Sequence, residues 1–114
     1  MNNLRKLIRY TLAAFIIVFA INLFMVDKVA SKGDTVAVDY WLTVDGKQID
    51  TSEGRGVFEF TLFDGQVIPG FDKTVDGMKV GEEKTVSLSG NDAYTAGPLA
   101  GKVLNFKVIL REIK

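Results

Sequence analysis

The sequence contains no cysteine and no histidine. Such a chain has no disulfides, no thiol redox chemistry, no Ser-His or Cys-His nucleophile pair and almost none of the usual zinc or iron ligand sets. It also lacks the one side chain that ordinarily titrates near neutral pH. No pair of carboxylates has a spacing typical of hydrolysis or of a metal site. We therefore expect no metal and no cofactor, and any catalysis must proceed without a histidine proton shuttle.

The formal net charge is zero, but two opposite charges cancel. Residues 1–32 carry five basic side chains and one acidic side chain, which gives +4, whereas residues 33–114 carry nine basic and thirteen acidic ones, which gives −4. The C-terminal part is thus acidic, and no basic patch is interleaved with aromatic residues. Because nucleic-acid binding depends on positive charge facing the phosphates, we expect no nucleic-acid partner.

The only long uncharged apolar run is at residues 10–26. A helix of this length rises about 25 Å, slightly less than the ~30 Å hydrocarbon core of a bilayer. Arg9 and Lys28 flank the run and can extend their charged ends toward the headgroups. The pattern predicts a transmembrane helix over residues 10–26, after a basic flank at 1–9 and before a short linker at 27–32.

A cleaved signal peptide is the alternative interpretation of the same pattern. Against it, the only small-residue candidate for a cleavage site, Lys28-Val29-Ala30, has a lysine where a small residue is expected. Asn22 in the run could hydrogen-bond to another transmembrane helix or lie near the interface in contact with water, and the sequence leaves both open.

The basic residues also predict an orientation for this span. Arg5, Lys6 and Arg9 precede the apolar run, against Lys28 and Lys32 after it. Because positive charge stays on the cytoplasmic side, the N-terminus is expected in the cytoplasm and the C-terminal domain outside it. The predicted location is a membrane, crossed once.

Beyond residue 33 the pattern changes to alternation of apolar and polar residues. Residues 35–42 place Val36, Val38, Tyr40 and Leu42 on one face of a strand, and Asp45-Gly46 then favours a hairpin turn into residues 47–50. Further strands are predicted at 57–62, 84–88 and 102–113, and a short helix at 71–77. The last strand carries Val103, Phe106, Val108, Leu110 and Ile113 with roughly period two. The expected fold is α+β, with an antiparallel sheet of about five strands and one short helix.

Several motifs in residues 33–114 occur in an order that resembles a known family. They include GQVIPGFD at 65–72, GMKVGE at 77–82 and PLAGKVLNF at 98–106. In this combination they resemble the FKBP-type peptidyl-prolyl cis-trans isomerases. The last block is most similar to the SlyD-like branch, without the chaperone domain that this branch inserts just before it. The resemblance implies an FKBP-like sheet wrapped on the short helix, with proline-containing polypeptides as partners.

The resemblance also implies an apolar pocket between the sheet and the helix. Phe71 is expected at its floor, and a bound proline peptide is expected to hydrogen-bond to the backbone near Ile68 and to the Tyr94 hydroxyl. The residues expected to carry catalysis are Tyr40, Asp50, Ile68, Phe71, Tyr94 and Phe106. Those expected to bind substrate are Ile49, Phe58, Phe60 and Val67. The walls of the pocket are expected to be formed by Tyr40, Phe60 and Phe106.

Such a pocket suits a chain without histidine. Amide resonance gives rotation about an X-Pro bond a barrier of ~18–20 kcal/mol, and the twisted transition state has lost that resonance and some of its charge separation. A dry aromatic pocket disfavours the polar planar ground state relative to the twisted one. Each 1.4 kcal/mol of this difference is about tenfold in rate, and no proton is transferred.

Each of these residues also has a purely structural interpretation. Aromatic residues that alternate along strands commonly form core, and Asp50 beside Thr51 and Ser52 could cap a turn. Residues 95–97 are too short to form the apolar flap that closes the family's pocket, so we expect an open pocket and weak isomerase activity. Two functions remain: an isomerase acting on exported or membrane proteins, or a non-catalytic accessory subunit that binds or caps partner chains and packs beside other transmembrane subunits.

Overall fold

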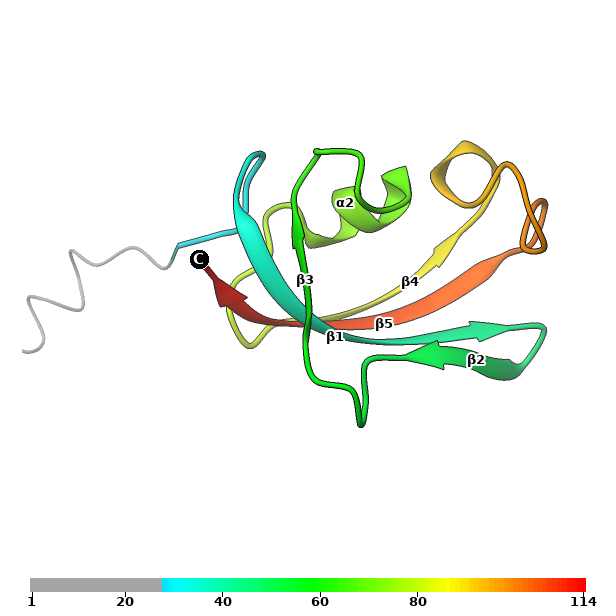
Figure 1. The fold of residues 1–114 in the computed structure, drawn as a ribbon, viewed down its shortest axis with the longest axis horizontal. Helices are drawn as coiled ribbons and strands as arrows, with labels where there is room; N and C mark the ends of the chain where they lie inside the picture. Colours follow the sequence, from blue (N-terminus) through cyan, green and yellow to red (C-terminus); the bar gives the residue numbers. More distant parts are fainter. Residues whose placement is uncertain (1–27) are drawn as a thin grey trace, which may run out of the picture.

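A computed structural model describes residues 28–114 of the chain (Figure 1). The predicted basic flank and transmembrane helix, residues 1–9 and 10–26, lie outside the described residues. Within residues 28–114, neither the helix nor the short 3-10 turn has the length and apolar character needed to span a bilayer.

The sheet is built around the strand β1 (Thr35–Val44). Its other strands are β2 (Lys47–Thr51), β3 (Phe58–Thr61), β4 (Glu83–Leu88) and β5 (Leu104–Ile113), joined in the order β2-β1-β5-β4 with β3 also paired to β1. All the pairs are antiparallel, as the alternating sequence pattern predicts. The prediction of an antiparallel five-stranded sheet with one short helix is confirmed.

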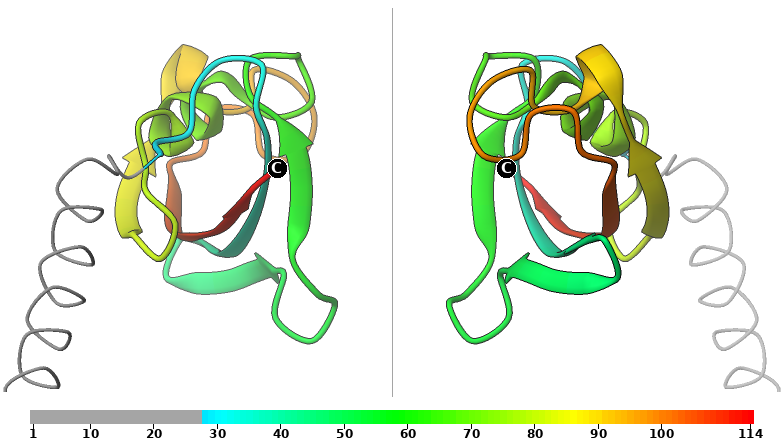
Figure 2. Two further views of the ribbon diagram at one scale, coloured as in Figure 1. Left: turned by 90° about the vertical axis from the view of Figure 1, so that its left-hand side faces the viewer. Right: turned by 90° about the vertical axis from the view of Figure 1, so that its right-hand side faces the viewer.

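β2 and β3 share one edge of β1, and the gap between them is bridged by a serine. Leu42 of β1 pairs with Asp50, and Val36 pairs with Phe60. Between these two pairs, Ser52 donates its amide to the Tyr40 carbonyl at 3.1 Å, and its Oγ accepts the Tyr40 amide at 3.0 Å. The chain after β2 therefore leaves the sheet at Ser52, and Figure 2 shows the loop that follows projecting from the domain before β3 begins.

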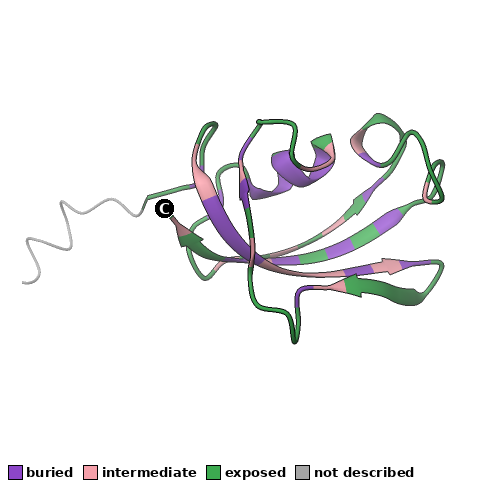
Figure 3. Ribbon diagram, in the orientation of Figure 1, coloured by how far each residue is buried: buried purple, intermediate pink, exposed green. Residues whose placement is uncertain are grey.

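The helix α2 (Pro69–Val75) packs against the concave face of the sheet (Figure 1). It begins two residues before the predicted start because Pro69 is a favourable first residue of a helix, its fixed φ suiting the first turn. It ends two residues before the predicted end, and Gly77 follows with a φ of 83°, a conformation that favours glycine. Phe71 and Val75 of the helix are buried against the sheet (Figure 3).

The last strand begins later than its predicted start at residue 102. Val103, one of the apolar residues predicted within this strand, lies before β5 and is exposed. Leu104 is buried instead, and alternation then buries Phe106, Val108 and Leu110. The register of β1 against β5 shifts between Ala37 and Val38, which is why the strict alternation does not reach the end of the strand.

The residues just before β1 are attached to the domain. Ala30 is 1% exposed and belongs to the core. Its amide donates to the Met78 carbonyl at 2.9 Å, and its carbonyl accepts the Gly77 amide at 2.7 Å. The described part of the predicted linker, residues 28–32, is therefore packed on the domain instead of forming a free connection.

Candidate functional site

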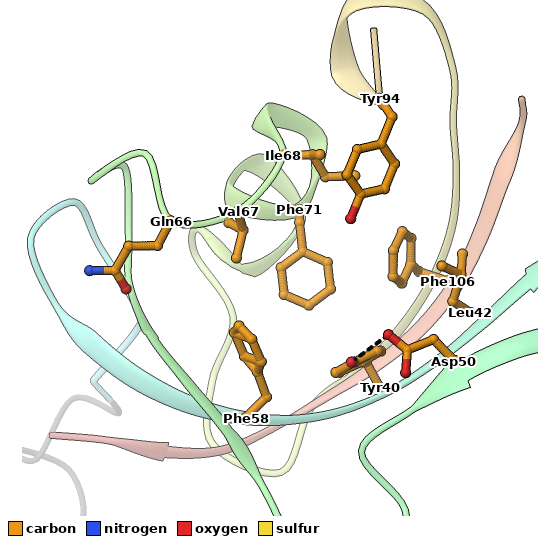
Figure 4. A pocket seen from close by; sticks show the side chains of 10 residues that line it. All are labelled: Tyr40, Leu42, Asp50, Phe58, Gln66, Val67, Ile68, Phe71, Tyr94 and Phe106. Carbon is orange, nitrogen blue, oxygen red and sulfur yellow. Dashed lines mark hydrogen bonds between the residues drawn. The ribbon is translucent and has the colours of Figure 1, made fainter. Parts of the chain in front are cut away.

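A cavity of about 280 Å³ lies between the concave face of the sheet and the first turn of α2 (Figure 4). Its wall combines side chains from β1, β2, β3 and β5 with Tyr94, the residues that lead into the helix and Phe71 of its first turn. The lining residues are Tyr40, Leu42, Asp50, Phe58, Gln66, Val67, Ile68, Phe71, Tyr94 and Phe106.

Phe71 lies at the centre of an aromatic cluster that forms the base of this cavity. Its ring centroid is 5.2 Å from that of Phe106, 5.4 Å from that of Phe60 and 6.1 Å from that of Tyr40. The rings are inclined at 58° to 83°, so that ring edges meet ring faces, the arrangement that aromatic quadrupoles favour. These contacts make the base of the cavity aromatic and apolar.

Eight of the ten predicted site residues line the cavity. Phe60 does not, because it is buried beneath Phe58 and Phe71 as core and makes no wall. Ile49 does not either: it is 43% exposed and borders a shallow depression outside the cavity, next to Arg55. Neighbouring residues of a strand point to opposite faces, so with Asp50 facing the cavity Ile49 faces away.

The structure adds two lining residues that the sequence analysis did not identify. Leu42 lies two positions after Tyr40 in β1, and the alternation that placed both on one face could have identified it. Gln66 lies at the other end of the cavity, where its Oε1 accepts the Thr61 amide at 3.0 Å. Gln66 belongs to the GQVIPGFD motif at 65–72, so the same motif that carries the family resemblance could have identified it.

One wall of the cavity is polar. The Tyr40 hydroxyl donates to Asp50 Oδ2 at 2.8 Å, a contact drawn in Figure 4. Asp50 Oδ1 accepts from Arg55 Nη2 at 2.7 Å and from the Thr51 amide at 2.8 Å. Burial raises the pKa of the Tyr40 hydroxyl, and the bond to Asp50 raises it further, whereas the Arg55 charge opposes these effects. Asp50 is thus held by three donors from β1, β2 and the loop after β2.

A second polar cluster supports Tyr40 from behind. Ser52 donates its hydroxyl to Asp39 Oδ1 at 2.7 Å, and Arg111 Nε donates to Asp39 Oδ2 at 2.8 Å. The hydrogen bond from Ser52 lowers the pKa of the Asp39 carboxyl, and Arg111 lowers it further. Because Ser52 also accepts the Tyr40 amide, this cluster fixes the backbone where Tyr40 enters the cavity.

The opposite rim of the cavity is formed by Ile68 and Tyr94. Ile68 precedes α2 in an extended conformation, and its carbonyl accepts the Phe71 amide at 3.0 Å. Tyr94 follows the 3-10 turn η1 (Gly90–Asp92) and is 42% exposed. Lys73 of α2 bonds to Asp92 at 2.7 Å, which fastens the chain before Tyr94 to the helix.

Within residues 28–114, no group of acidic side chains is arranged to hold a metal ion. The cavity instead offers an aromatic base, one fixed carboxylate and one exposed tyrosine hydroxyl. This combination suits a small apolar group attached to a polar backbone.

Residues 26–111 match the family profile of the FKBP-type peptidyl-prolyl cis-trans isomerases. The chain is also similar to trigger factors. It is 39% identical over 88 residues to that of Staphylococcus epidermidis and 43% identical over 89 residues to that of a Nitratiruptor species. Each match covers 77% of this chain but 20% of the relative, so the chain spans about a fifth of the length of these curated relatives. The chain belongs to the FKBP-type family, and residues 26–111 are a peptidyl-prolyl cis-trans isomerase domain.

Proposed function

We propose that this protein is a membrane-anchored peptidyl-prolyl cis-trans isomerase that acts on X-Pro bonds of exported or membrane proteins. The observation that carries the proposal is the cavity based on Phe71, with Tyr40 and Asp50 on one wall and Ile68 and Tyr94 on the other. Isomerisation of X-Pro bonds takes tens to hundreds of seconds without a catalyst, which is slow enough to limit folding.

The size of the cavity supports a prolyl ring as the bound group. A volume of about 280 Å³ is just below the usual range for small-molecule sites, which runs from ~300 to ~1,000 Å³. It therefore suits one residue-sized apolar group, with the flanking residues of the substrate outside. Contact with the rings of Phe71 and Phe106 would remove water from the imide and disfavour its planar, polar ground state.

Asp50 is suited to a fixed electrostatic role and not to proton transfer. Both of its carboxylate oxygens accept hydrogen bonds, and Arg55 balances its charge. The pair presents an oriented dipole beside the cavity, which can favour the altered charge distribution of the twisted bond without reorganising. This role agrees with a reaction that transfers no proton.

The opposite rim would hold the substrate backbone. The Tyr94 hydroxyl is exposed there, and the Ile68 amide donates to no backbone carbonyl within the described part of the chain. These two donors on the same rim would hold the peptide backbone so that the X-Pro bond twists over Phe71.

The membrane part of the proposal rests on the sequence. Residues 10–26 form an uncharged run of suitable length, and the basic residues before it favour a cytoplasmic N-terminus. The domain would then meet polypeptides on the outer side of the membrane. Placement in the SlyD-like branch is also a proposal, supported by residues 98–106 and by the short connection after Tyr94.

A second candidate function is a non-catalytic accessory subunit of a membrane complex, which binds or caps partner chains. The exposure of Tyr94 favours it, because a pocket open to water disfavours the planar ground state less than a closed one. Asn22 would in that case contact a transmembrane helix of a partner.

The first experiment measures isomerisation of a proline peptide by the full chain in detergent. Phe71→Leu is compared with Phe60→Leu, since both residues are buried in the same cluster but only Phe71 lines the cavity. We expect Phe71→Leu to lose most of the activity and Phe60→Leu to keep most of it. A wild-type rate equal to that of buffer would eliminate the enzyme and leave the accessory subunit.

The second experiment tests the partner. The protein is purified in mild detergent at native abundance, and its size is measured. An isomerase that acts alone elutes as a small species, whereas an accessory subunit elutes within a larger assembly.

A further inference from the structure

The segment that leads from residue 28 to β1 is fastened at two places. At the first, Ala30 exchanges two backbone hydrogen bonds with the loop after α2, and Val29 pairs with Lys79 in an antiparallel bridge. At the second, Gly33 donates to the Leu62 carbonyl at 3.1 Å. With Ala30 in the core, the domain cannot swing on this segment without exposing core and breaking paired backbone groups.

A third set of contacts closes the turn between these two places. Asp34 Oδ2 accepts from the Ser31 amide at 3.1 Å and from its hydroxyl at 3.2 Å, and the Asp34 amide donates to the Ser31 carbonyl at 3.0 Å. The Asp34 carbonyl in turn accepts the Leu62 amide at 2.9 Å. The segment is therefore a fixed part of the domain.

Few residues separate this fixed segment from the apolar run. Four steps of chain join Val26 to Ala30, and a fully extended chain covers at most about 14 Å in that number. If residues 10–26 lie in a bilayer, Ala30 and the loop that holds it must lie close to the bilayer surface.

The surface at this point combines exposed apolar side chains with balanced charge. We call it the entry face, consisting of residues 28–34 and 76–82. Val29 is 41% exposed and Val80 is 56% exposed, and the bridge between Val29 and Lys79 brings the two chain segments that carry them together. The charged residues of the entry face are Lys28, Lys32, Lys79, Asp34, Asp76 and Glu82, three of each sign.

The rest of the described surface is acidic. Residues 28–114 carry eleven basic and thirteen acidic side chains, and because the entry face is balanced, the excess of negative charge lies elsewhere. An anionic bilayer would repel the remainder of the domain but not the entry face.

We infer that the entry face rests against the headgroup region of the bilayer that holds residues 10–26, with Val29 and Val80 at the interface, and that the Tyr94 rim of the cavity is held away from the lipid. The inference rests on the proposed function, since it takes residues 10–26 as a membrane anchor.

The helix α2 sets the separation between the entry face and the cavity. Phe71 in its first turn lines the cavity, and shortly after its last residue, Val75, the backbones of Gly77 and Met78 bond to Ala30. A seven-residue helix is about 10 Å long. Figure 1 shows η1 and the loop after it at the opposite end of the domain from the segment that starts at residue 28. The preferred substrates are thus prolines in aqueous parts of a chain, not prolines at headgroup depth.

The test uses the full chain in anionic lipid vesicles. The protein has no cysteine, so single cysteines introduced at Phe19, Val80 and Thr95 can each carry a fluorescent label without background. Lipids with a quencher at the headgroup and lipids with a quencher deep in the acyl chains report the depth of each label. We expect the Phe19→Cys label to be quenched by the deep lipid, the Val80→Cys label to lose most of its fluorescence to the headgroup quencher, and the Thr95→Cys label to lose little.

The outcomes separate the two proposals. A Phe19→Cys label untouched by either quencher would refute the membrane anchor, and the inference with it. A deep Phe19→Cys label with equal quenching at Val80→Cys and Thr95→Cys would refute the inference alone.

A linker variant supplies the matched control. A Gly-Ser insert of about twelve residues after Asp27, with a root-mean-square span of about 20 Å, frees the domain without altering it. We expect the insert to reduce quenching at Val80→Cys and to leave Phe19→Cys unchanged. Undiminished quenching at Val80→Cys would mean that the entry face binds lipid without needing the short connection, and would overturn the role given to that connection.

Discussion

The main-chain oxygen of Asp92 lies 2.6 Å from the position that a Cβ atom on Gly70 would occupy. The Leu88 methyl groups lie 2.8 Å from the same position. The helix that carries Phe71 and the turn that precedes Tyr94 therefore meet at a point where only a glycine fits, and this contact fixes the width of the cavity between them.

Gly70→Ala is expected to lower both stability and activity. The added methyl group forces the backbone at Asp92 away, which costs about 1–3 kcal/mol of unfolding free energy and moves Tyr94. Urea unfolding and the proline-peptide assay measure the two effects. Gly97→Ala is the control: Gly97 has a φ of 81° with no atom near its Cβ position, so alanine brings only backbone strain. Equal activity losses in the two variants would contradict the steric explanation.

Tyr94→Phe tests the hydroxyl at the rim. The side chain is 42% exposed, so stability should change little. If the hydroxyl donates to the substrate, its loss removes about 0.5–1.5 kcal/mol and lowers kcat/KM about 2- to 12-fold. Tyr94→Ala removes the ring as well and should lower kcat/KM further. Unchanged kcat/KM in Tyr94→Phe would exclude a substrate hydrogen bond at this position.

The ionisation of Tyr40 gives a spectroscopic signature of the polar wall. Burial and Asp50 raise its pKa, so the difference in ultraviolet absorbance between the wild type and Tyr40→Phe should titrate above pH ~10. Asp50→Asn should lower this midpoint and Arg55→Gln should raise it, because their charges act in opposite directions. Shifts of the same sign in both variants would contradict the arrangement.

The same shift has a consequence for stability in alkali. Because the pKa of Tyr40 is raised in the folded protein, the unfolded chain loses the proton first as the pH rises. The contribution of Tyr40 is therefore complete below about pH 10 and is lost as the pH rises through the folded-state pKa. Tyr40→Phe should show a shallower loss of stability there.

Asp39 should control part of the loss of stability in acid. Its pKa is lowered in the folded protein, so its contribution is complete above the unfolded-state value of about 3.9 and is lost as the pH falls through the folded-state pKa. Urea midpoints at about pH 6 and about pH 3 should differ less in Asp39→Asn than in the wild type.

Two partner variants test the causes of this effect. The hydrogen bond from Ser52 is the largest single cause of the lowered pKa of Asp39, and Arg111 lowers this pKa through both a hydrogen bond and its charge, so Ser52→Ala and Arg111→Met should each reduce the acid dependence. For each variant, the quantity compared is the difference between its urea midpoints at the two pH values. The midpoints themselves are not compared, because Ser52 is buried and its loss also lowers stability at neutral pH. An acid dependence that stays at the wild-type level in either variant would contradict the cause assigned to that partner.

Local patterns were sufficient for the strands and for much of the cavity. Alternation placed Val36, Val38 and Leu42 on the buried face of β1, since the side-chain period of a strand is two. The resemblance to the family placed Tyr40 and Phe71 among the predicted catalytic residues, and both line the cavity. Whether the lining residues bind and isomerise a proline peptide stays a prediction.

The sequence analysis was wrong or incomplete where the environment of a residue depends on parts of the chain that are distant in sequence. Phe60 lies two positions after Phe58, so the strand pattern places both on the face that lines the cavity. In the structure Phe71 packs against Phe60 and covers it. Arg55 belongs to an exposed glycine-rich loop, and only the departure of the chain from the sheet at Ser52 brings it to Asp50 and Tyr40. The periodicity of a strand or helix does not determine where such residues lie relative to one another, so the sequence pattern could not predict these contacts.

The sequence by itself determined the antiparallel strands, the short helix after Ile68 and the family, because periodicity, turn residues and ordered motifs are local properties of the chain. Only the tertiary structure decided which aromatic residues face the cavity, how the Asp50 carboxylate is held, and that Ala30 belongs to the core. Those outcomes depend on long-range packing, where β1 meets three strands and α2 closes over them.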